Sequence, residues 1–234
     1  MPYEIKDFDS GYKVCKRDEN KCFSNKPIPL SRAKKQMSAI GLKEKYKGQG
    51  IPEAVKEEID ENLPVPMGDA DIHKYLPNAR IYTYPQIAKY EDIEQLLPNN
   101  NDYFIVLYLD SPTTGHWTAV LRYDGKIENF DSYGKTPDAP LNWQSKDKLA
   151  GLGQYDKYLS NLYNSTDLKV VYNDIPYQDE KDRSIATCGR HVVNRILRLL
   201  KQRYSGCDYA RYMKKLKKDT KLSYDEIVSG LIDN

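Results

Sequence analysis

The spacing of hydrophobic and polar residues predicts a chain in which strands and helices are intermixed. Tyr103–Leu109 is an almost continuous apolar run, which is typical of a central strand buried on both faces. Asp124-Gly125 separates two strand-like segments and is a strong signal for a hairpin with a two-residue turn. The predicted strands are Ala79–Tyr84, which ends at Pro85, Tyr103–Leu109, Trp117–Tyr123, Lys126–Asp131 and Leu168–Asn173.

Helical spacing, with apolar residues at every third or fourth position, occurs in the same part of the chain. In Cys188–Tyr204 this spacing places Val192, Val193, Ile196 and Leu200 on one inner face. The predicted helices are one that begins at Asp69 or Asp71 and ends at Tyr75, Gln86–Leu97, Lys148–Tyr163 and Cys188–Tyr204. Together these segments indicate an α+β fold with a mixed central sheet flanked by helices.

The first fifty residues have a different character. They are rich in Lys and Arg, contain two cysteines and show little strand character. Ser31 is a suitable N-cap for a short helix over Arg32–Ile40, and Gly48-Gln49-Gly50 is typical of a flexible joint. We therefore expect a basic N-terminal extension, residues 1–50, followed by a folded domain over residues 51–234.

Charge and composition narrow the class of protein. The chain has 234 residues and a net charge of +2, so the whole molecule is not a strongly basic nucleic-acid binder. We expect no signal peptide and no membrane span, because no apolar stretch is long enough. Four cysteines are too few for a disulfide scaffold, so free thiols in a reducing compartment are expected. A zinc site at Cys15 and Cys22 would need two more ligands, and no metal site is predicted.

The predicted hairpin brings a histidine and an aspartate together. If Asp124-Gly125 forms the turn, Thr118 pairs with Asp131 on the neighbouring strand. His116 lies on the same face as Thr118, because side chains alternate along a strand. Asp131 is then diagonal to His116 and within reach of an imidazole–carboxylate hydrogen bond, unless a bulge reverses the alternation.

A candidate nucleophile begins the last predicted helix. Cys188 lies at the positive end of the helix dipole, which favours the thiolate form. Gln178, in the preceding loop, has a side-chain amide that can donate to an oxyanion, and the Cys188 backbone N–H is a second donor. Gly189 leaves room for a substrate backbone.

Each of these residues also has a purely structural explanation when it is taken alone. A cysteine at a helix start is often a packing residue, and Asp131 is also suited to a turn. The ordered set of His116, Asp131, Gln178 and Cys188 nevertheless supplies a base, an orienting carboxylate, an oxyanion donor and a nucleophile. This combination favours a thiol acyl-transfer site.

Three short runs and one glutamine resemble the adenovirus-protease (adenain) and ubiquitin-like-protease superfamily of cysteine proteases. The runs are Gly115-His116-Trp117, Phe130-Asp131-Ser132-Tyr133-Gly134 and Ala186-Thr187-Cys188-Gly189, and Gln178 lies between the last two. The resemblance covers about residues 65–205. It implies an adenain-like fold, a His116-Asp131-Cys188 triad and Gln178 as oxyanion donor. Trp117 would line a narrow channel that admits small residues, often glycine. The charged insert Asp179–Arg183 makes the interval before Cys188 longer than is usual in that family.

The resemblance also implies a function. With its Lys-rich and Tyr-rich composition, the chain is most similar to maturation proteases of virophages and related adenovirus-like DNA viruses. The expected substrates are capsid or other virion precursors, cleaved at small-residue sites in the virion and the host cytoplasm. No cofactor is expected to be required, although viral DNA or a viral peptide would be an activator, as in the adenovirus enzyme. Lys201–Lys221 is a candidate DNA contact or a solvated helix face, Cys207 is expected to be a free surface thiol, and no membrane partner is expected.

Three alternatives to this function stay open. A protease that deconjugates ubiquitin-like proteins and an effector-type acyltransferase would both use the same four residues. A non-enzymatic DNA-binding or capsid-binding protein would account for the basic segments and predicts an unreactive Cys188.

Overall fold

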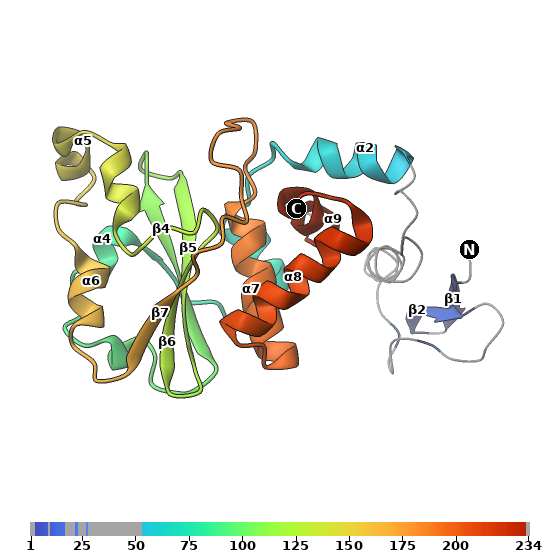
Figure 1. Ribbon diagram of the computed structural model, residues 1–234, viewed down its shortest axis with the longest axis horizontal. Coiled ribbons are helices and arrows are strands. Elements are labelled where there is room, and N and C mark those ends of the chain that lie inside the picture. Colours follow the sequence, from blue (N-terminus) through green and yellow to red (C-terminus); the bar gives the residue numbers. More distant parts are fainter. Residues whose placement is uncertain (1–2, 9, 17–21, 23–26, 28–52, 233–234) are drawn as a thin grey trace.

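The computed structural model of the chain describes residues 3–8, 10–16, 22, 27 and 53–232 (Figure 1). Two strands near the N-terminus, β1 (Tyr3–Phe8) and β2 (Gly11–Lys16), form an antiparallel hairpin. The main sheet has five strands in the order β3-β4-β5-β6-β7. They are β3 (Ile81–Thr83), β4 (Asp102–Leu109), β5 (Gly115–Tyr123), β6 (Lys126–Asp131) and β7 (Lys169–Tyr172).

The main sheet is mixed. Its three central strands are antiparallel, while β3 runs parallel to β4 and β7 runs parallel to β6. The helices are α2 (Glu53–Asn62), α3 (Asp69–Tyr75), α4 (Tyr84–Ile87), α5 (Lys146–Gly151), α6 (Tyr158–Tyr163), α7 (Cys188–Gln202), α8 (Gly206–Thr220) and α9 (Tyr224–Leu231), with short 3₁₀ turns η1 (Ile93–Gln95) and η2 (Ala139–Trp143). The predicted α+β class, a mixed central sheet flanked by helices, is confirmed.

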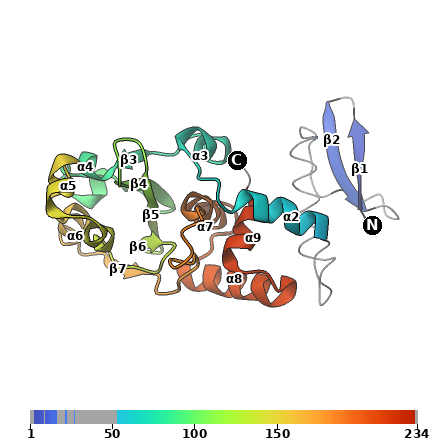
Figure 2. The same ribbon diagram turned by 90° about the horizontal axis from the view of Figure 1, so that it is seen from above.

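The sheet separates two hydrophobic layers. Figures 1 and 2 show α4, α5 and α6 over one face and α7, α8 and α9 over the other. In β4, Ile105 and Leu107 pack toward α7, while Phe104 and Val106 pack toward α4 and α6. A strand that is buried on both faces needs apolar residues at every position, which explains the continuous run in the sequence.

The helix predicted over Gln86–Leu97 is wrong. The chain instead forms the short helix α4 and, after an extended Asp92 (φ −132°), the turn η1. The Asp92 carboxylate accepts a hydrogen bond from the Glu94 N–H at 2.8 Å and so caps the turn. The apolar residues Ile93, Leu96 and Leu97 are buried against the sheet without a continuous helix.

The single helix predicted over Lys148–Tyr163 is also wrong, because it is divided into α5 and α6. Gly153 lies between them with φ +72°, a left-handed conformation that ends a right-handed helix. Gln154 then turns inward and extends the sheet hydrogen bonding: the Leu109 N–H donates to its Oε1 at 2.7 Å, and its Nε2 donates to the Leu109 carbonyl at 2.8 Å.

The expectation that all four cysteines are free thiols is wrong as well. Cys15 and Cys22 form a disulfide and lie opposite each other in an isolated antiparallel bridge. Cys188 and Cys207 are free, and Cys207 is exposed as predicted.

Most of the predicted N-terminal extension falls outside the described residues. This applies to the helix predicted over residues 32–40 and to the joint at residues 48–50, so the domain boundary near residue 50 stays a prediction. Among the helices that the structure describes, none has the length and hydrophobicity needed to cross a bilayer.

Candidate active site

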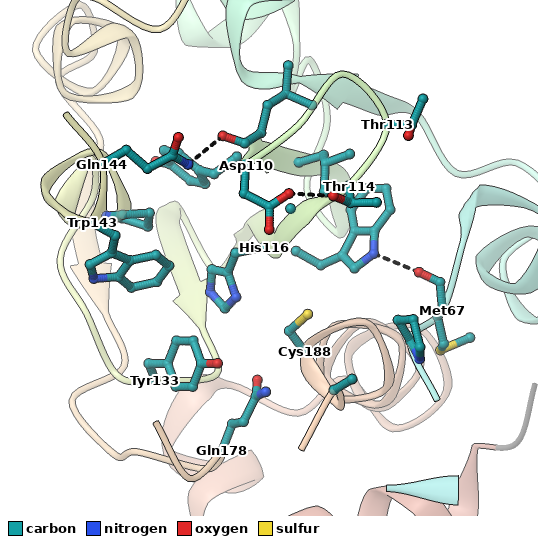
Figure 3. A pocket seen from close by; sticks show the side chains of 18 of the residues that line it. Met67, Asp110, Thr113, Thr114, His116, Tyr133, Trp143, Gln144, Gln178 and Cys188 are labelled. Carbon is teal, nitrogen blue, oxygen red and sulfur yellow. Dashed lines mark hydrogen bonds between the residues drawn. The ribbon is translucent and has the colours of Figure 1, made fainter. Parts of the chain in front are cut away.

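A pocket of about 540 Å³ opens where the first residues of β5 meet the first residue of α7. The segment 66–69 and the turn η2 complete its walls. Figure 3 shows the Cys188 sulfur and the Gln178 amide pointing into this pocket, with the His116 ring across from them. The structure therefore brings His116, Gln178 and Cys188, which lie far apart in the sequence, to one cavity.

The position of His116 depends on a glycine. Gly115 opposes Leu109 in the β4–β5 ladder, and a Cβ added at Gly115 would lie 1.9 Å from the Tyr108 carbonyl oxygen. Only a residue without a side chain allows the two strands to approach this closely. The glycine of the Gly115-His116-Trp117 run thus sets the backbone from which the imidazole extends.

Asp131 lies beside His116, as the hairpin alternation predicts. Thr118 pairs with Asp131 in the observed register, and His116 Nε2 lies 2.9 Å from Asp131 Oδ1. The aspartate is fixed from β7, because its N–H donates to Asn173 Oδ1 at 2.8 Å and Asn173 Nδ2 donates to its carbonyl at 2.6 Å. The Tyr133 N–H donates to the same carboxylate oxygen at 2.8 Å.

The charge state of His116 follows from these contacts. Burial lowers the pKa of the imidazole, but the Asp131 carboxylate, through its charge and its hydrogen bond, and the Cys188 thiol raise the pKa to about 10. The side chain of His116 is 8% exposed and that of Asp131 is 1% exposed, so water screens this interaction little. The imidazolium form is therefore favoured next to the sulfur at neutral pH.

Cys188 is the first residue of α7, and its thiol is half-buried. The first N–H groups of a helix have no partner within the helix and attract negative charge, so this position is suited to binding an oxyanion. A buried ion pair holds α7 against the sheet. In this pair, Arg195 Nε and Nη2 donate to the two carboxylate oxygens of Glu128, on β6, at 2.8 and 2.7 Å. Cys188 is thus fixed relative to the strands that carry His116 and Asp131.

Gln178 lines the same pocket as Cys188 despite the long loop between them. Its backbone N–H donates to the Ser132 carbonyl at 2.9 Å, and its side-chain Oε1 accepts from Ser132 Oγ at 2.8 Å. Its Nε2 donates to the Ile185 carbonyl at 3.2 Å, which uses one of the two amide hydrogens. The second hydrogen is available to an oxyanion in the pocket. The charged insert bulges outward as exposed loop and does not displace Gln178.

Two aromatic residues that the sequence analysis did not assign to the site hold the imidazole. The Tyr133 ring is stacked on His116 with centroids 4.7 Å apart, and the Trp143 and His116 rings are in edge-to-face contact with centroids 5.2 Å apart. Trp143 is 44% exposed and lies on η2, the 3₁₀ turn between β6 and α5. The sequence signal for Tyr133 was its place two residues after Asp131, whereas Trp143 had no local signal.

Trp117 and Gly189 differ in their relation to the pocket. Trp117 lines it, and its Nε1 donates to the Met67 carbonyl at 2.9 Å, which ties the segment before α3 to the pocket wall. Gly189 does not line the pocket. A Cβ on Gly189 would lie 2.9 Å from Met67 Cβ and 3.2 Å from Trp117 Cδ1, so this glycine is closely packed, and its contact with a substrate backbone stays a prediction.

Comparison with known proteins places the chain among viral relatives. No family model matches it. It is 32% identical over 167 residues to "Uncharacterized protein V9" of the Sputnik virophage. The matched region covers 70% of this chain and 93% of the virophage protein. The chain belongs to the V9 family. The expectation of a virophage relative is therefore confirmed.

Among solved structures, this chain is weakly similar to two proteases. The ASFV pS273R protease is 15% identical with a TM-score of 0.40, covering 90% of this chain and 92% of the protease. The C-terminal Ulp1 protease domain, in complex with Smt3, the yeast ortholog of SUMO, is 14% identical with a TM-score of 0.35, covering 78% of this chain and 95% of that domain. Similarity at this level supports no conclusion about the reaction.

Proposed function

We propose that this protein is a cysteine endopeptidase with Cys188 as its nucleophile. The observation that supports this most strongly is the placement of His116. Its Nε2 is bound to Asp131 at 2.9 Å, its pKa is raised to about 10, and the Cys188 thiol is one of the groups that raise it. A buried imidazolium oriented by a carboxylate, next to a thiol at a helix start, is the arrangement that thiol proteolysis needs.

The proposed reaction has two stages. The Cys188 thiolate attacks the scissile carbonyl carbon, and the carbonyl oxygen becomes an oxyanion that accepts from Gln178 Nε2 and the Cys188 backbone N–H. His116 gives its Nδ1 proton to the leaving amine, the C–N bond breaks and a thioester remains. Water then gives a proton to His116 and attacks the thioester, which releases the carboxylic acid and restores the thiolate.

We propose further that the substrates are virion or capsid precursors, cleaved next to small residues such as glycine in the virion and the host cytoplasm. Two observations support this. The chain belongs to a family with a virophage protein, and Met67 and Trp143 lie on opposite sides of the pocket (Figure 3), which Trp117, bound to Met67, also lines. Large side chains next to the scissile bond would collide with these walls.

Contact with DNA through Lys201–Lys221 is part of the proposal as a means of activation. Most of this segment forms α8, on which the lysines Lys214, Lys215, Lys217 and Lys218 are all exposed. Lys215 is paired with Asp219, so the exposed positive charge is partly neutralised within the helix. Activation by duplex DNA that weakens steeply as salt rises would support the contact, and equal activity with and without DNA would contradict it.

The decisive experiment is mass spectrometry of a co-expressed virophage capsid precursor with the wild type, Cys188→Ala and Cys207→Ala. Cys207 is the matched control, because it is a free thiol outside the pocket. We expect cleavage by the wild type and Cys207→Ala, no cleavage by Cys188→Ala, and loss of the pocket's iodoacetamide adduct only in Cys188→Ala. Cleavage by Cys188→Ala would contradict the mechanism.

The same experiment separates the proposal from two other reactions of this thiol. A ubiquitin-like protein whose C-terminal Gly-Gly carries an amide-linked fluorophore, supplied as a probe, would be cleaved by a deconjugating protease with release of the fluorophore. Acetyl-coenzyme A, supplied with the precursor, would yield an acetylated product instead of a cleaved chain if the protein were an acyltransferase. Processing of the probe alone, or acetylation alone, would replace the endopeptidase assignment.

A further inference from the structure

The two oxyanion donors are tied together from a helix that has no other part in the site. We propose that Asp225, on α9, is a positioning residue that sets the Gln178 amide and the first N–H groups of α7 at the spacing an oxyanion needs. The proposal rests on the proposed function, since it concerns the same reaction.

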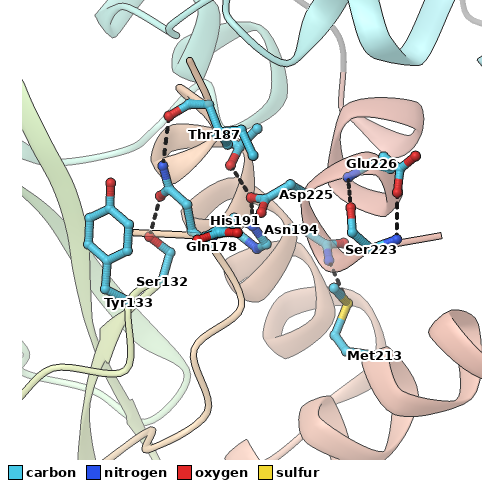
Figure 4. Close-up of polar contacts among 12 residues, drawn as sticks. Ser132, Tyr133, Gln178, Thr187, His191, Asn194, Met213, Ser223, Asp225 and Glu226 are labelled. Carbon is cyan, nitrogen blue, oxygen red and sulfur yellow. Dashed lines mark hydrogen bonds and ion pairs between the residues drawn. The ribbon is translucent and has the colours of Figure 1, made fainter. Parts of the chain in front are cut away.

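Three hydrogen bonds converge on the Asp225 carboxylate (Figure 4). Its Oδ1 accepts from Thr187 Oγ1 and from His191 Nε2, the latter at 3.0 Å, and its Oδ2 accepts from the Asp179 N–H at 3.0 Å. Asp179 directly follows Gln178 in the chain, and Thr187 directly precedes Cys188. One carboxylate therefore connects both ends of the charged loop at the two points from which the oxyanion donors extend.

Burial makes this connection stiff. Asp225 is 3% exposed, and Thr187 and His191 are fully buried. Hydrogen bonds to an ionised acceptor are short and strong, and they are stronger still where water is excluded. The carboxylate has both oxygens occupied, so Asp179 and Thr187 have little freedom to move apart.

The Thr187 hydroxyl is used for the hydrogen bond to Asp225 and not for capping α7. Thr187 is the N-cap of α7, where a threonine hydroxyl ordinarily accepts a hydrogen bond from the first turn. Here the Thr187 hydroxyl makes no such cap and donates to Asp225 instead. The first N–H groups of α7 are consequently not covered by their own N-cap side chain and can serve an anion in the pocket.

Asp225 is itself held in place by the start of α9. The Ser223 N–H donates to Glu226 Oε2 at 2.6 Å and the Glu226 N–H donates to Ser223 Oγ at 3.1 Å, which forms a capping box around Asp225. Ile227 and Val228 bury the helix in the core layer beside α7. The carboxylate is thus presented from a fixed backbone.

The test compares Thr187→Val, Asp225→Ala and Asp225→Asn with the control Ser229→Ala in the full-length protein. Ser229 is buried on the same helix, and its hydroxyl has no partner among the described residues, so its removal should change little. Thr187→Val removes the hydroxyl while keeping the size of the side chain, so it tests the same link if Asp225→Ala fails to fold. Asp225→Asn keeps an acceptor for the Asp179 N–H, and its amide can donate to Thr187 Oγ1 and to an unprotonated His191 Nε2.

Each variant is measured by kcat and KM for a peptide, by affinity for a peptide aldehyde and by the rate of Cys188 alkylation with iodoacetamide. The aldehyde adduct places an oxygen in the oxyanion site, whereas alkylation needs only the thiolate. For Thr187→Val and Asp225→Ala we expect kcat and aldehyde affinity to fall together by about 10- to 100-fold, with KM and the alkylation rate within about twofold of the wild type. Asp225→Asn should recover most of the loss.

Unchanged kcat and aldehyde affinity in Thr187→Val and Asp225→Ala, or an alkylation rate that falls as far as kcat, would overturn the positioning role while leaving the protease proposal intact. A wild type that neither cleaves peptides nor is alkylated at Cys188 would instead overturn the proposed function, and the role of Asp225 with it.

Discussion

His116 binds Asp131 through Nε2 across the β5–β6 hairpin, which leaves Nδ1 as the ring nitrogen that meets the Cys188 thiol. The carboxylate holds one proton of the imidazolium, so the proton on Nδ1 is the one that can be transferred to a leaving amine. The ring is kept in this orientation by the stacked Tyr133 and by the edge of Trp143.

We expect the activity to extend unusually far into alkaline pH. Although burial lowers the pKa of His116, the Asp131 charge helps to raise it to about 10, and the imidazolium is the form that protonates the leaving group. The plateau of kcat/KM should therefore end near pH 10. In Asp131→Asn the raising charge is lost, and the alkaline limb should move down by about one pH unit or more. Identical limbs in the two proteins would contradict this account.

Replacement of Gly115 by alanine should unfold the site. Its added Cβ would lie 1.9 Å from the Tyr108 carbonyl oxygen, so the two strands would have to separate. We expect a loss of about 2–4 kcal/mol in the free energy of unfolding, measured in urea, and no cleavage. Gly151→Ala is the control, because nothing lies within 4 Å of the added Cβ on this helix residue, and it should change stability by less than about 1 kcal/mol.

Gln178→Ala should lower kcat by about 100- to 1,000-fold with little change in KM, as expected for loss of an oxyanion donor. Ser132→Ala removes only the hydroxyl that donates to Gln178 Oε1 at 2.8 Å, so the amide becomes less well oriented and kcat should fall less, by roughly 3- to 10-fold. Steady-state kinetics on one peptide would rank the variants. A larger effect from Ser132→Ala than from Gln178→Ala would remove Gln178 from the mechanism.

Trp143→Ala should impair catalysis without weakening the fold. The indole is 44% exposed, so little buried area is lost, but its edge confines the His116 ring and forms part of the pocket. We expect a higher KM, a kcat that is lower by roughly 10-fold, and an unfolding midpoint close to that of the wild type. Trp143→Phe should retain much of the activity, since it keeps an aromatic edge. Wild-type kinetics in Trp143→Ala would show that the indole is dispensable.

The buried pair of Arg195 and Glu128 gives a prediction about stability. Both side chains are at most 3% exposed, and the Tyr123 hydroxyl also donates to the carboxylate. Arg195→Met would leave Glu128 charged and unpaired, which should cost about 3–5 kcal/mol in the free energy of unfolding. The double variant Arg195→Met with Glu128→Gln should recover a large part of this loss in urea titrations. No recovery would show that the arginine acts by packing alone.

The contact between His116 and Asp131 could be predicted from the sequence because it depends on local rules. Asp124-Gly125 specifies the turn length, the turn length specifies the register, and the register specifies which side chains share a face. The buried strand β4 was equally clear, since a strand covered on both faces must be apolar throughout.

The features that sequence reasoning missed depend on tertiary contacts. The division between α5 and α6 follows from the inward turn of Gln154 onto Leu109, and no local spacing reveals it. Trp143 reaches His116 from a turn between the sheet and α5, and Asp225 comes from a helix that follows Cys188 by more than thirty residues. Such residues become visible only when the fold brings their elements together.

The contribution of α9 also bears on the time at which the protein acquires activity. During synthesis, a chain that has emerged from the ribosome only as far as α8 already contains His116, Asp131, Gln178 and Cys188. It still lacks Asp225, and with it the link between Asp179 and Thr187. We therefore expect a nascent chain without α9 to have poorly positioned oxyanion donors, so that the proposed proteolysis of neighbouring chains on the same polysome stays slow until α9 has been translated and has folded onto α7.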